Sequence, residues 1–147
     1  ILEYSLIESL NNLKYVDGNL NADSTILNTI DKLEYVGGDL ILSYTNILSL
    51  PKLKYVGGNL KLDYTQIESL SDNLTIDKNL SLLTCVNIKM LPNNLKIGGS
   101  LNMIRTSIES LNNTLIINRV IYTRFSKMLQ TNSLDDVRLK YPKYEIN

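Results

Sequence analysis

Few side chains of this 147-residue chain have the types and spacing that catalysis requires. The sequence contains no histidine, which excludes histidine-based triads, histidine-liganded metals and histidine proton shuttles. Its single cysteine, Cys85, cannot form an internal disulfide or a cysteine-based zinc site. Because Cys85 falls in or beside a column of hydroxyl-bearing residues, we expect a buried structural thiol in preference to a nucleophile.

Asp23 and Asp63 form a pair of carboxylates whose spacing resembles that of acid–base pairs. They are two units of the repeat described below apart, which is roughly 10 Å at the spacing of adjacent strands. That distance is near the carboxylate separation of inverting glycosidases. However, Ser43 lies between the two residues, and the sequence indicates no pocket around them. We therefore assign no catalytic residue and do not expect an enzyme.

Three Gly-Gly pairs, at 37–38, 57–58 and 98–99, are the other candidates for chemistry. A glycine-rich loop can cradle a phosphate, but these pairs lack the Gly-x-Gly-x-x-Gly and Walker spacings, and no helix is expected after them. They also lack the Gly-Gly-x-Gly-x-Asp pattern of calcium-binding repeats. We predict neither a cofactor nor a metal site, and attribute the glycines to tight corners with positive φ.

The glycine pairs belong to a repeat of about 20 residues, in which residues 33–40 match residues 53–60 almost letter for letter. A unit of this length cannot bury its own apolar face, but stacked copies can, because equivalent residues form continuous columns inside the stack. The Leu-x-Leu steps predict short strands that assemble into a parallel sheet. Four apolar columns run through the chain: Leu20, Leu40, Leu60, Leu80, Leu101 and Ile121; Leu2, Ala22, Leu42, Leu62, Leu82 and Met103; Ile7, Leu27, Ile47, Ile67, Ile88 and Ile108; and Leu10, Ile30, Leu50, Leu70, Leu91 and Leu111.

The pattern Leu60-x-Leu62-x-x-Thr65-x-Ile67-x-x-Leu70 resembles the leucine-rich-repeat signature Leu-x-Leu-x-x-Asn-x-Leu-x-x-Leu. The variant with Val-Gly-Gly and Thr looks like repeats of bacterial and bacteriophage proteins and is similar to the coils of receptor L domains. The resemblance covers residues 1 to about 122. It implies a mostly β fold, namely a right-handed parallel β-solenoid of about six coils with a short α-helical C-terminal cap.

Hydroxyl side chains stand where most leucine-rich repeats have asparagine. A hydroxyl can satisfy part of the backbone that the asparagine would bond. We therefore predict a buried hydroxyl ladder at Ser5, Thr25, Thr45, Thr65 and Thr106. A second ladder is expected at Ser9, Thr29, Ser49, Ser69 and Ser110.

Two irregularities interrupt the repeat. On the back of each coil, the first three copies have the spacing Leu-x-x-Val, as at Leu53 and Val56, whereas later copies have Leu-x-Ile. The first spacing favours a turn or 3₁₀ segment and the second an extended strand, so the back should change near residue 70. One extra residue lies between Leu82 and Ile88, which predicts a bulge.

The two ends of the chain depart from the repeat. Ile1 aligns with the middle of a strand, so we expect further N-terminal repeats or another domain upstream of it. We assign residues 1–122 to the solenoid and residues 123–147 to a C-terminal cap. In the cap, Ser133 is expected to begin a short helix that ends at Tyr141-Pro142. Its apolar residues should lie over the last coil: Phe125, Met128, Leu129, Leu134, Val137 and Leu139.

The strand positions that alternate with the core leucines form the natural binding surface. They mix aromatic, acidic, basic and amide groups, which suits protein recognition, although ordinary solvated surface is the alternative. Separately, Tyr15, Tyr35 and Tyr55 recur at repeat spacing and favour a structural ladder over an aromatic contact strip. The candidate binding residues are Tyr4, Asp23, Ile41, Ser43, Tyr44, Lys61, Asp63, Tyr64, Asn102, Arg105 and Tyr122.

The leading hypothesis is a non-catalytic module that binds a protein partner through this strand face. Net charge is zero and no basic stripe is clustered, so no nucleic-acid partner is predicted. No apolar run approaches 18 residues, so no membrane-spanning helix is expected. The alternatives are a structural component of a larger assembly, such as a phage particle, and the targeting domain of a larger enzyme.

Overall fold

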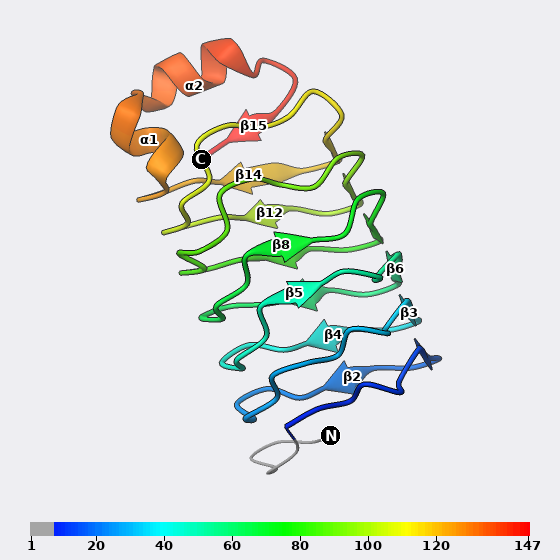
Figure 1. Ribbon diagram of the computed structural model, residues 1–147. Coiled ribbons are helices and arrows are strands. Elements are labelled where there is room, and N and C mark those ends of the chain that lie inside the picture. The colour runs from blue at the N-terminus through cyan, green and yellow to red at the C-terminus, as the bar shows by residue number, and fades with distance from the viewer. Residues whose placement is uncertain (1–7) are drawn as a thin grey trace.

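The protein is a stack of short-stranded coils. The computed structural model describes residues 8–147, apart from the side chains of Gln130 and Thr131, and its parallel sheets form a β-solenoid of about five turns (Figure 1). Two short helices lie near the C-terminus. The predicted mostly β solenoid is confirmed, close to the six coils expected. Tyr4, Ser5 and the expected start in mid-strand lie outside the described residues.

One surface of the solenoid, which we call the strand face, is a seven-stranded parallel sheet. Equivalent residues of successive coils pair, so that Leu40 lies beside Leu60 and Ile41 beside Lys61. In β2 to β12, the first residue of each strand is buried and the second points outward. The strands are β2 (Leu20–Asn21), β4 (Leu40–Ile41), β7 (Leu60–Lys61), β10 (Leu80–Ser81), β12 (Leu101–Asn102), β14 (Val120–Tyr122) and β15 (Glu145–Ile146).

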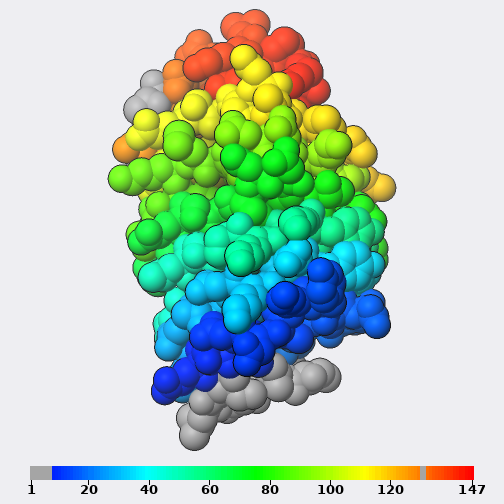
Figure 2. Space-filling model, turned by 45° about the vertical axis from the view of Figure 1, so that its right-hand side comes forward, coloured from blue at the N-terminus to red at the C-terminus, as the bar shows by residue number. Residues whose placement is uncertain are grey.

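The other sides of the stack are also parallel sheets. The third side has two strands, β5 (Ser49–Leu50) and β8 (Ser69–Leu70), and a bridge between Ser9 and Thr29. The back is a six-stranded sheet of β1 (Tyr15–Val16), β3 (Tyr35–Val36), β6 (Tyr55–Val56), β9 (Thr75–Ile76), β11 (Lys96–Ile97) and β13 (Ile116–Ile117). Successive coils therefore appear as stacked bands of colour in Figure 2.

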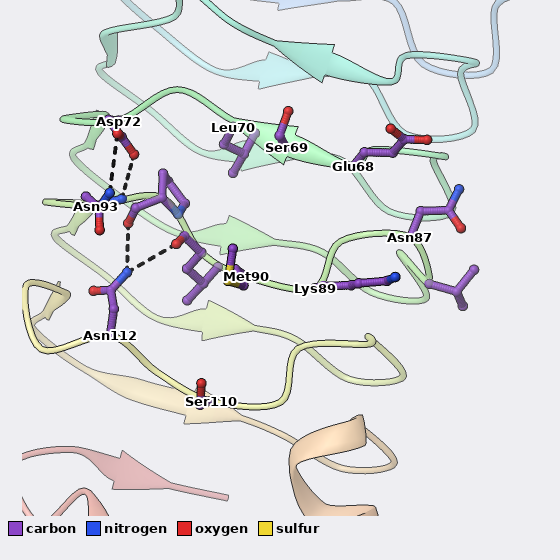
Figure 3. A pocket seen from close by; sticks show the side chains of 13 residues that line it. Glu68, Ser69, Leu70, Asp72, Asn87, Lys89, Met90, Asn93, Ser110 and Asn112 are labelled. Carbon is purple, nitrogen blue, oxygen red and sulfur yellow. Dashed lines mark hydrogen bonds between the residues drawn. The ribbon is translucent and has the colours of Figure 1, made fainter.

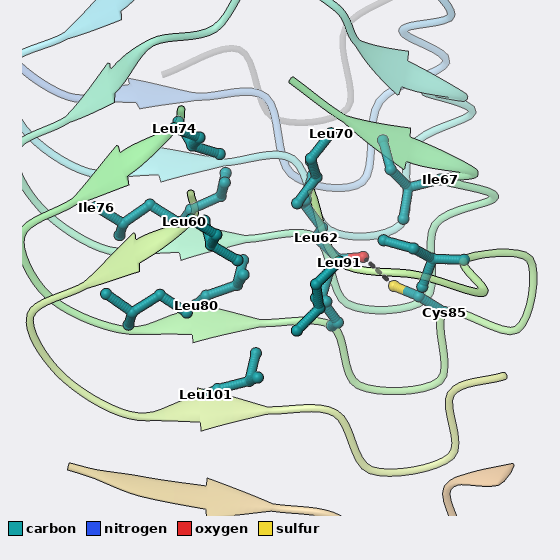
Figure 4. Packing of buried hydrophobic residues seen from close by; sticks show 14 of the residues in the cluster. Leu60, Leu62, Ile67, Leu70, Leu74, Ile76, Leu80, Cys85, Leu91 and Leu101 are labelled. Carbon is teal, nitrogen blue, oxygen red and sulfur yellow. Dashed lines mark hydrogen bonds between the residues drawn. The ribbon is translucent and has the colours of Figure 1, made fainter. Parts of the chain in front are cut away.

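The interior is filled by the described residues of the predicted apolar columns (Figure 4). Leu60, Leu62 and Ile67 are completely buried, because each packs within its coil and against the equivalent residues of the coils on either side. Full burial of such a side chain contributes about 1.5–3 kcal/mol. Since that burial depends on neighbouring coils, the columns hold the stack together.

The first predicted hydroxyl ladder is confirmed for its four described members. Thr25, Thr45, Thr65 and Thr106 are buried, and each donates its hydroxyl to the carbonyl oxygen three residues earlier at 2.6–2.8 Å. The prediction of a second buried ladder is wrong, because these positions alternate with buried leucines and therefore point outward. Of its members, Ser9, Ser69 and Ser110 are exposed, and Thr29 and Ser49 are half-buried.

The Gly-Gly pairs have a different cause from the one predicted. No described glycine has a positive φ. Instead, a Cβ atom on Gly57 would lie 2.3 Å from the carbonyl oxygen of Gly37, and one on Gly58 would lie 2.2 Å from Oδ1 of Asp39. Both distances are far inside van der Waals contact, so the pairs are required by the close approach of neighbouring coils.

A side-chain ladder that the sequence analysis missed runs beside these glycines. An oxygen of each member accepts a hydrogen bond from the backbone N–H of the equivalent residue in the next coil. The bonds measure 2.6–2.8 Å beside Gly38, Gly58 and Gly99, but 3.2 and 3.4 Å beside Lys78 and Arg119, which replace the glycine. The second glycine of each pair therefore permits a shorter hydrogen bond between the ladder residue and the next coil. The ladder consists of Asn19, Asp39, Asn59, Asn79 and Ser100.

The predicted change of the back near residue 70 does not occur in its strands. β6 and β9 each have two residues and pair in register. The one-residue slip of the leucine is absorbed in the preceding turn, where Asn73 and Asn94 adopt φ of 61° and 56°. Asparagine tolerates this left-handed conformation, so the turn changes while the sheet continues.

The extra residue near Cys85 is not a strand bulge. β10 pairs in register with both β7 and β12, and Cys85 occupies the place of a ladder threonine. The additional residue therefore lies after Cys85, in the connection formed by Val86 and Asn87. The strand face is uninterrupted, and the third side carries the disturbance.

The C-terminal residues form α1 (Lys127–Thr131), α2 (Leu134–Lys140) and β15. The predicted helix is confirmed: Ser133 caps α2 in a reciprocal capping box with Asp136, and Tyr141 follows its last residue. β15, which was not predicted, pairs with β14 and extends the strand face. Met128 and Val137 are buried as expected, whereas Phe125 and Leu139 are exposed, contrary to expectation. The division at residue 122 stays an interpretation.

Replacing Gly57 with alanine should destabilise the stack by about 1–3 kcal/mol, because the new methyl group meets a backbone oxygen that can move only with its coil. Gly18→Ala in the same 147-residue chain is the control, since no described atom lies within 4 Å of a Cβ there and φ is not positive. It should be neutral or stabilising by about 0.4–1 kcal/mol. Urea unfolding compares the two variants, and equal effects would contradict the close-approach explanation.

Asp39 should make folding stability depend on acid pH. The hydrogen bond donated by the Asn59 backbone holds the pKa of Asp39 below its ordinary value of 3.8. Its contribution is therefore present above the unfolded-state pKa and is lost as the pH falls through the lower folded-state pKa. Asp39→Asn keeps the acceptor without the titration, as at Asn19 and Asn59. Thermal unfolding between neutral pH and about pH 3 should show a smaller acid-induced loss in the variant.

Candidate binding face

The strand face gathers most of the predicted binding residues around one shallow hollow. The hollow has a volume of about 460 Å³ and also includes Asn21 and Leu83 in its lining. Ser43, expected to be exposed, is buried at its base. Asn102, Arg105 and Tyr122 lie further along the sheet and do not line it. The predicted residues brought together are Asp23, Ile41, Ser43, Tyr44, Lys61, Asp63 and Tyr64.

Tyr44 and Tyr64 form a stacked pair at the rim of this hollow. Their ring centroids are 4.8 Å apart and their planes differ by 8°. Both residues have φ of 57°, and both backbone N–H groups donate to a carbonyl oxygen of the following coil at 2.9 Å. Tyr44 and Tyr64 remain 56% and 41% exposed. The left-handed corner therefore presents two aromatic side chains outward in a fixed arrangement.

The same corner continues along the whole strand face, and we call its residues the corner column. One residue per coil adopts φ between 55° and 60°, immediately before the ladder threonine or its replacement. Tyr44, Tyr64 and Arg105 were predicted as binding residues, but their left-handed backbone was not predicted. The column consists of Ser24, Tyr44, Tyr64, Thr84, Arg105 and Phe125.

The two carboxylates of the hollow are partly engaged. Oδ1 of Asp63 accepts hydrogen bonds from the Ser81 hydroxyl at 2.5 Å and the Leu83 backbone N–H at 3.0 Å. Oδ2 of Asp23 accepts one from the hydroxyl of Ser24 at 3.1 Å. Lys61 makes no ion pair with a described residue. The hollow therefore presents oriented acidic groups and one amine to an incoming surface.

The remaining predicted residues surround a more basic end of the face. The guanidinium groups of Arg105 and Arg124 lie 5.7 and 5.0 Å from the ring centroid of Phe125. Phe125 is 57% exposed and was assigned by sequence to the cap. The repeat spacing could have indicated its position, because Phe125-Ser126 lies 20 residues after Arg105-Thr106. Asn102 is held by the Ile104 N–H and by Ser81, while Tyr122 is exposed.

Cys85 is a buried member of the threonine ladder, as predicted (Figure 4). Its thiol donates to the carbonyl oxygen of Leu62 at 2.9 Å and lies 3.6 Å from the hydroxyl of Thr65. Burial raises the pKa of the thiol. A protonated, enclosed thiol is a poor nucleophile, so the position suits packing.

The tyrosines of the back are also partly stacked. The rings of Tyr35 and Tyr55 are 5.1 Å apart at 15°, which confirms a structural ladder for this pair. The Tyr55 hydroxyl donates to a carboxylate oxygen of Asp77, and this bond raises the pKa of Tyr55. The back therefore offers a second tyrosine pair with which the strand-face pair can be compared.

A second hollow, larger than the one on the strand face, lies on the third side and was not predicted (Figure 3). It has a volume of about 760 Å³ and is lined by residues of three coils, including Glu68, Leu70 and Met90. It lies beside the extra residue of the preceding connection, where β8 is the last strand of its sheet and no backbone bond joins residues 68–70 to residues 89–91. The feature of the sequence that could have indicated this hollow is the spacing of 21 residues between Ile67 and Ile88, which is 20 in the coil before. Met90 is 75% exposed there.

Comparison with protein-family models, curated proteins and solved structures found no match for the chain. The resemblance to leucine-rich repeats accordingly stays a prediction. Between residues 8 and 147, no helix is long and apolar enough to cross a membrane. The described residues contain no group of three or more potential acidic, cysteine or histidine ligands placed to hold a metal ion.

Cys85→Thr should fold with little change in stability, because threonine occupies the same place in four other coils and can donate to the carbonyl three residues earlier. Cys85→Val, which has the same shape without a donor, should be less stable than Cys85→Thr by about 1 kcal/mol. Chemical unfolding measures the difference. Equal stabilities would show that the ladder bond contributes nothing at this coil.

Proposed function

We propose that the protein is a non-catalytic recognition module that binds another protein through its strand face. The observation that carries the proposal is the hollow in which the exposed Tyr44–Tyr64 stack adjoins Asp23, Lys61 and Asp63. Exposed tyrosines surrounded by polar groups are the composition of many protein interfaces.

The stack is prepared for binding before a partner arrives. Each tyrosine is anchored by a coil-to-coil backbone bond, and each ring restricts its neighbour. Little side-chain entropy therefore remains to be lost on association. The Asp63 carboxylate is similarly oriented by Ser81 and Leu83. A shallow surface with fixed aromatic and charged groups suits a protein partner better than an enclosed small molecule.

The proposal of a non-catalytic role is supported by the state of the reactive groups. The chain has no histidine, and its cysteine is enclosed in the core. In the strand-face hollow, both carboxylates accept bonds from neighbouring hydroxyl or backbone groups. The hydroxyl and backbone donors orient the two acidic side chains, which suits contact with a partner.

The two tyrosine pairs provide a matched test. A partner isolated with the wild-type protein is measured against Tyr44→Ser/Tyr64→Ser and against Tyr35→Ser/Tyr55→Ser, which makes the same change on the back. The strand-face variant should weaken binding by about tenfold or more, while the back variant leaves it unchanged once both are shown to be folded.

Three results would contradict the proposal: equal loss from both variants, no loss from the strand-face variant, or failure to find a partner under conditions where the protein is present at its natural level. Copurification in fixed stoichiometry with large particles, insensitive to the strand-face change, would favour the structural-component alternative.

A further inference from the structure

The corner column is a regular stack in which side chains of successive coils point the same way. Its first five residues donate their backbone N–H to a carbonyl oxygen of the next coil at 2.9–3.1 Å. All six have φ between 55° and 60°. Because the backbone conformation and the coil-to-coil bond are the same, each Cα–Cβ bond is parallel to the one before it. A side chain in this column therefore lies against its neighbours one coil away.

The column carries planar groups on both sides of one short residue. Tyr44 and Tyr64 stack at 4.8 Å, and the Arg105 guanidinium lies 5.7 Å from the Phe125 ring. Thr84 stands between these pairs and reaches no further than its methyl and hydroxyl groups. No ring or cation of the described residues covers the face of Tyr64 that points toward Thr84. The series of planar groups is thus interrupted for one coil, and we call this interruption the Thr84 gap.

The dimensions of the Thr84 gap match one aromatic ring. Tyr64 and Arg105 are two coils apart, which is roughly 10 Å at the spacing of parallel strands. A ring placed midway would lie roughly 5 Å from each, within the range for both aromatic stacking and a cation–π contact. The Thr84 hydroxyl is buried without a hydrogen-bond partner, so the outer part of this side chain is its methyl group. The floor of the gap is therefore apolar.

We propose that the Thr84 gap receives an aromatic side chain of a protein partner, held between the Tyr64 ring and the Arg105 guanidinium. The inference rests on the proposed function and names the contact that would anchor it. Arg105 attracts the electron-rich face of a ring, and tryptophan is the strongest such acceptor. Asp63 lies in the coil before Thr84 and carries a charge opposite to that of Arg105 in the coil after it. An aromatic residue of a protein is the occupant that fits both charges.

Filling the Thr84 gap from within gives the sharpest test. In the Thr84→Tyr variant, the new ring should stack on Tyr64, and the backbone φ of 60° already accommodates tyrosine at 57° in two other coils. The probe is N-acetyltryptophanamide, titrated while the backbone amides of Tyr64, Thr84 and Arg105 are observed by NMR. The wild type should show saturable shifts at these amides, and Thr84→Tyr should abolish them.

Ser24→Tyr is the matched control, because it adds the same side chain at the same kind of corner while leaving the Thr84 gap open. Ser24→Tyr should show the same probe-induced NMR shifts as the wild type. Arg105→Gln is a second variant, which adds no ring. It should weaken binding of N-acetyltryptophanamide by about tenfold, because the guanidinium that covers the bound ring is lost. Absence of shifts in the wild type, or shifts that persist in Thr84→Tyr, would overturn the proposal.

Two further arms separate this inference from the proposed function. Adenosine monophosphate is titrated in parallel, and tighter binding of the nucleotide than of N-acetyltryptophanamide in the Thr84 gap would overturn the assignment to a protein side chain. The isolated partner is then measured against Thr84→Tyr. If the partner depends on Tyr44 and Tyr64 but binds Thr84→Tyr with wild-type affinity, the proposed function stands and the inference about the gap fails.

Discussion

Hydrogen bonding between the backbones of successive coils is the constraint on which the rest of the structure depends. A coil of about 20 residues has no core of its own, so its backbone groups and apolar side chains are satisfied by its neighbours. The bonds from Leu40 to Asn59 and from Leu60 to Asn79 both measure 2.9 Å. Such uniform bonds keep equivalent residues of adjacent coils in contact. They explain why Gly57 leaves no room for a methyl group and why Tyr44 and Tyr64 lie ring against ring.

A single additional residue shows what happens when one side of a coil leaves this register. After Cys85, the connection is longer by one residue, yet β10 and β11 still pair with both neighbours. On the third side, no backbone bond joins residues 68–70 to residues 89–91, and the hollow beside Met90 lies there. Side chains bridge its edges: Asn87 donates to Gln66, and Asp72 accepts from the Asn93 backbone. The insertion is therefore confined to one side while the strand face keeps its regular column of side chains.

The sequence predicted the features that depend on periodicity alone. The stacked strands, the apolar columns and the threonine ladder follow because Leu60, Leu62 and Thr65 recur at a fixed spacing. Most residues that line the strand-face hollow were predicted as binding residues for the same reason, although the hollow itself was not predicted. Features that depend on how closely coils approach were missed or misread, since a glycine required for contact and a glycine required for positive φ have the same letter. The ladder from Asn19 to Ser100 was missed because its members differ in type and share only an acceptor oxygen. β15 was missed because its short strand lies outside the repeat.

Hydrogen exchange at the corner column tests the central role of coil-to-coil bonding most directly. The side chains of Tyr44 and Tyr64 are exposed and lie in turns, but their backbone N–H groups are bonded to the next coil. Measured by NMR, the amides of Ser24, Tyr44, Tyr64, Thr84 and Arg105 should exchange as slowly as those of the neighbouring strands β4, β7 and β10. Exchange of these five amides at the rate of an unfolded chain, with the strands still protected, would contradict the account.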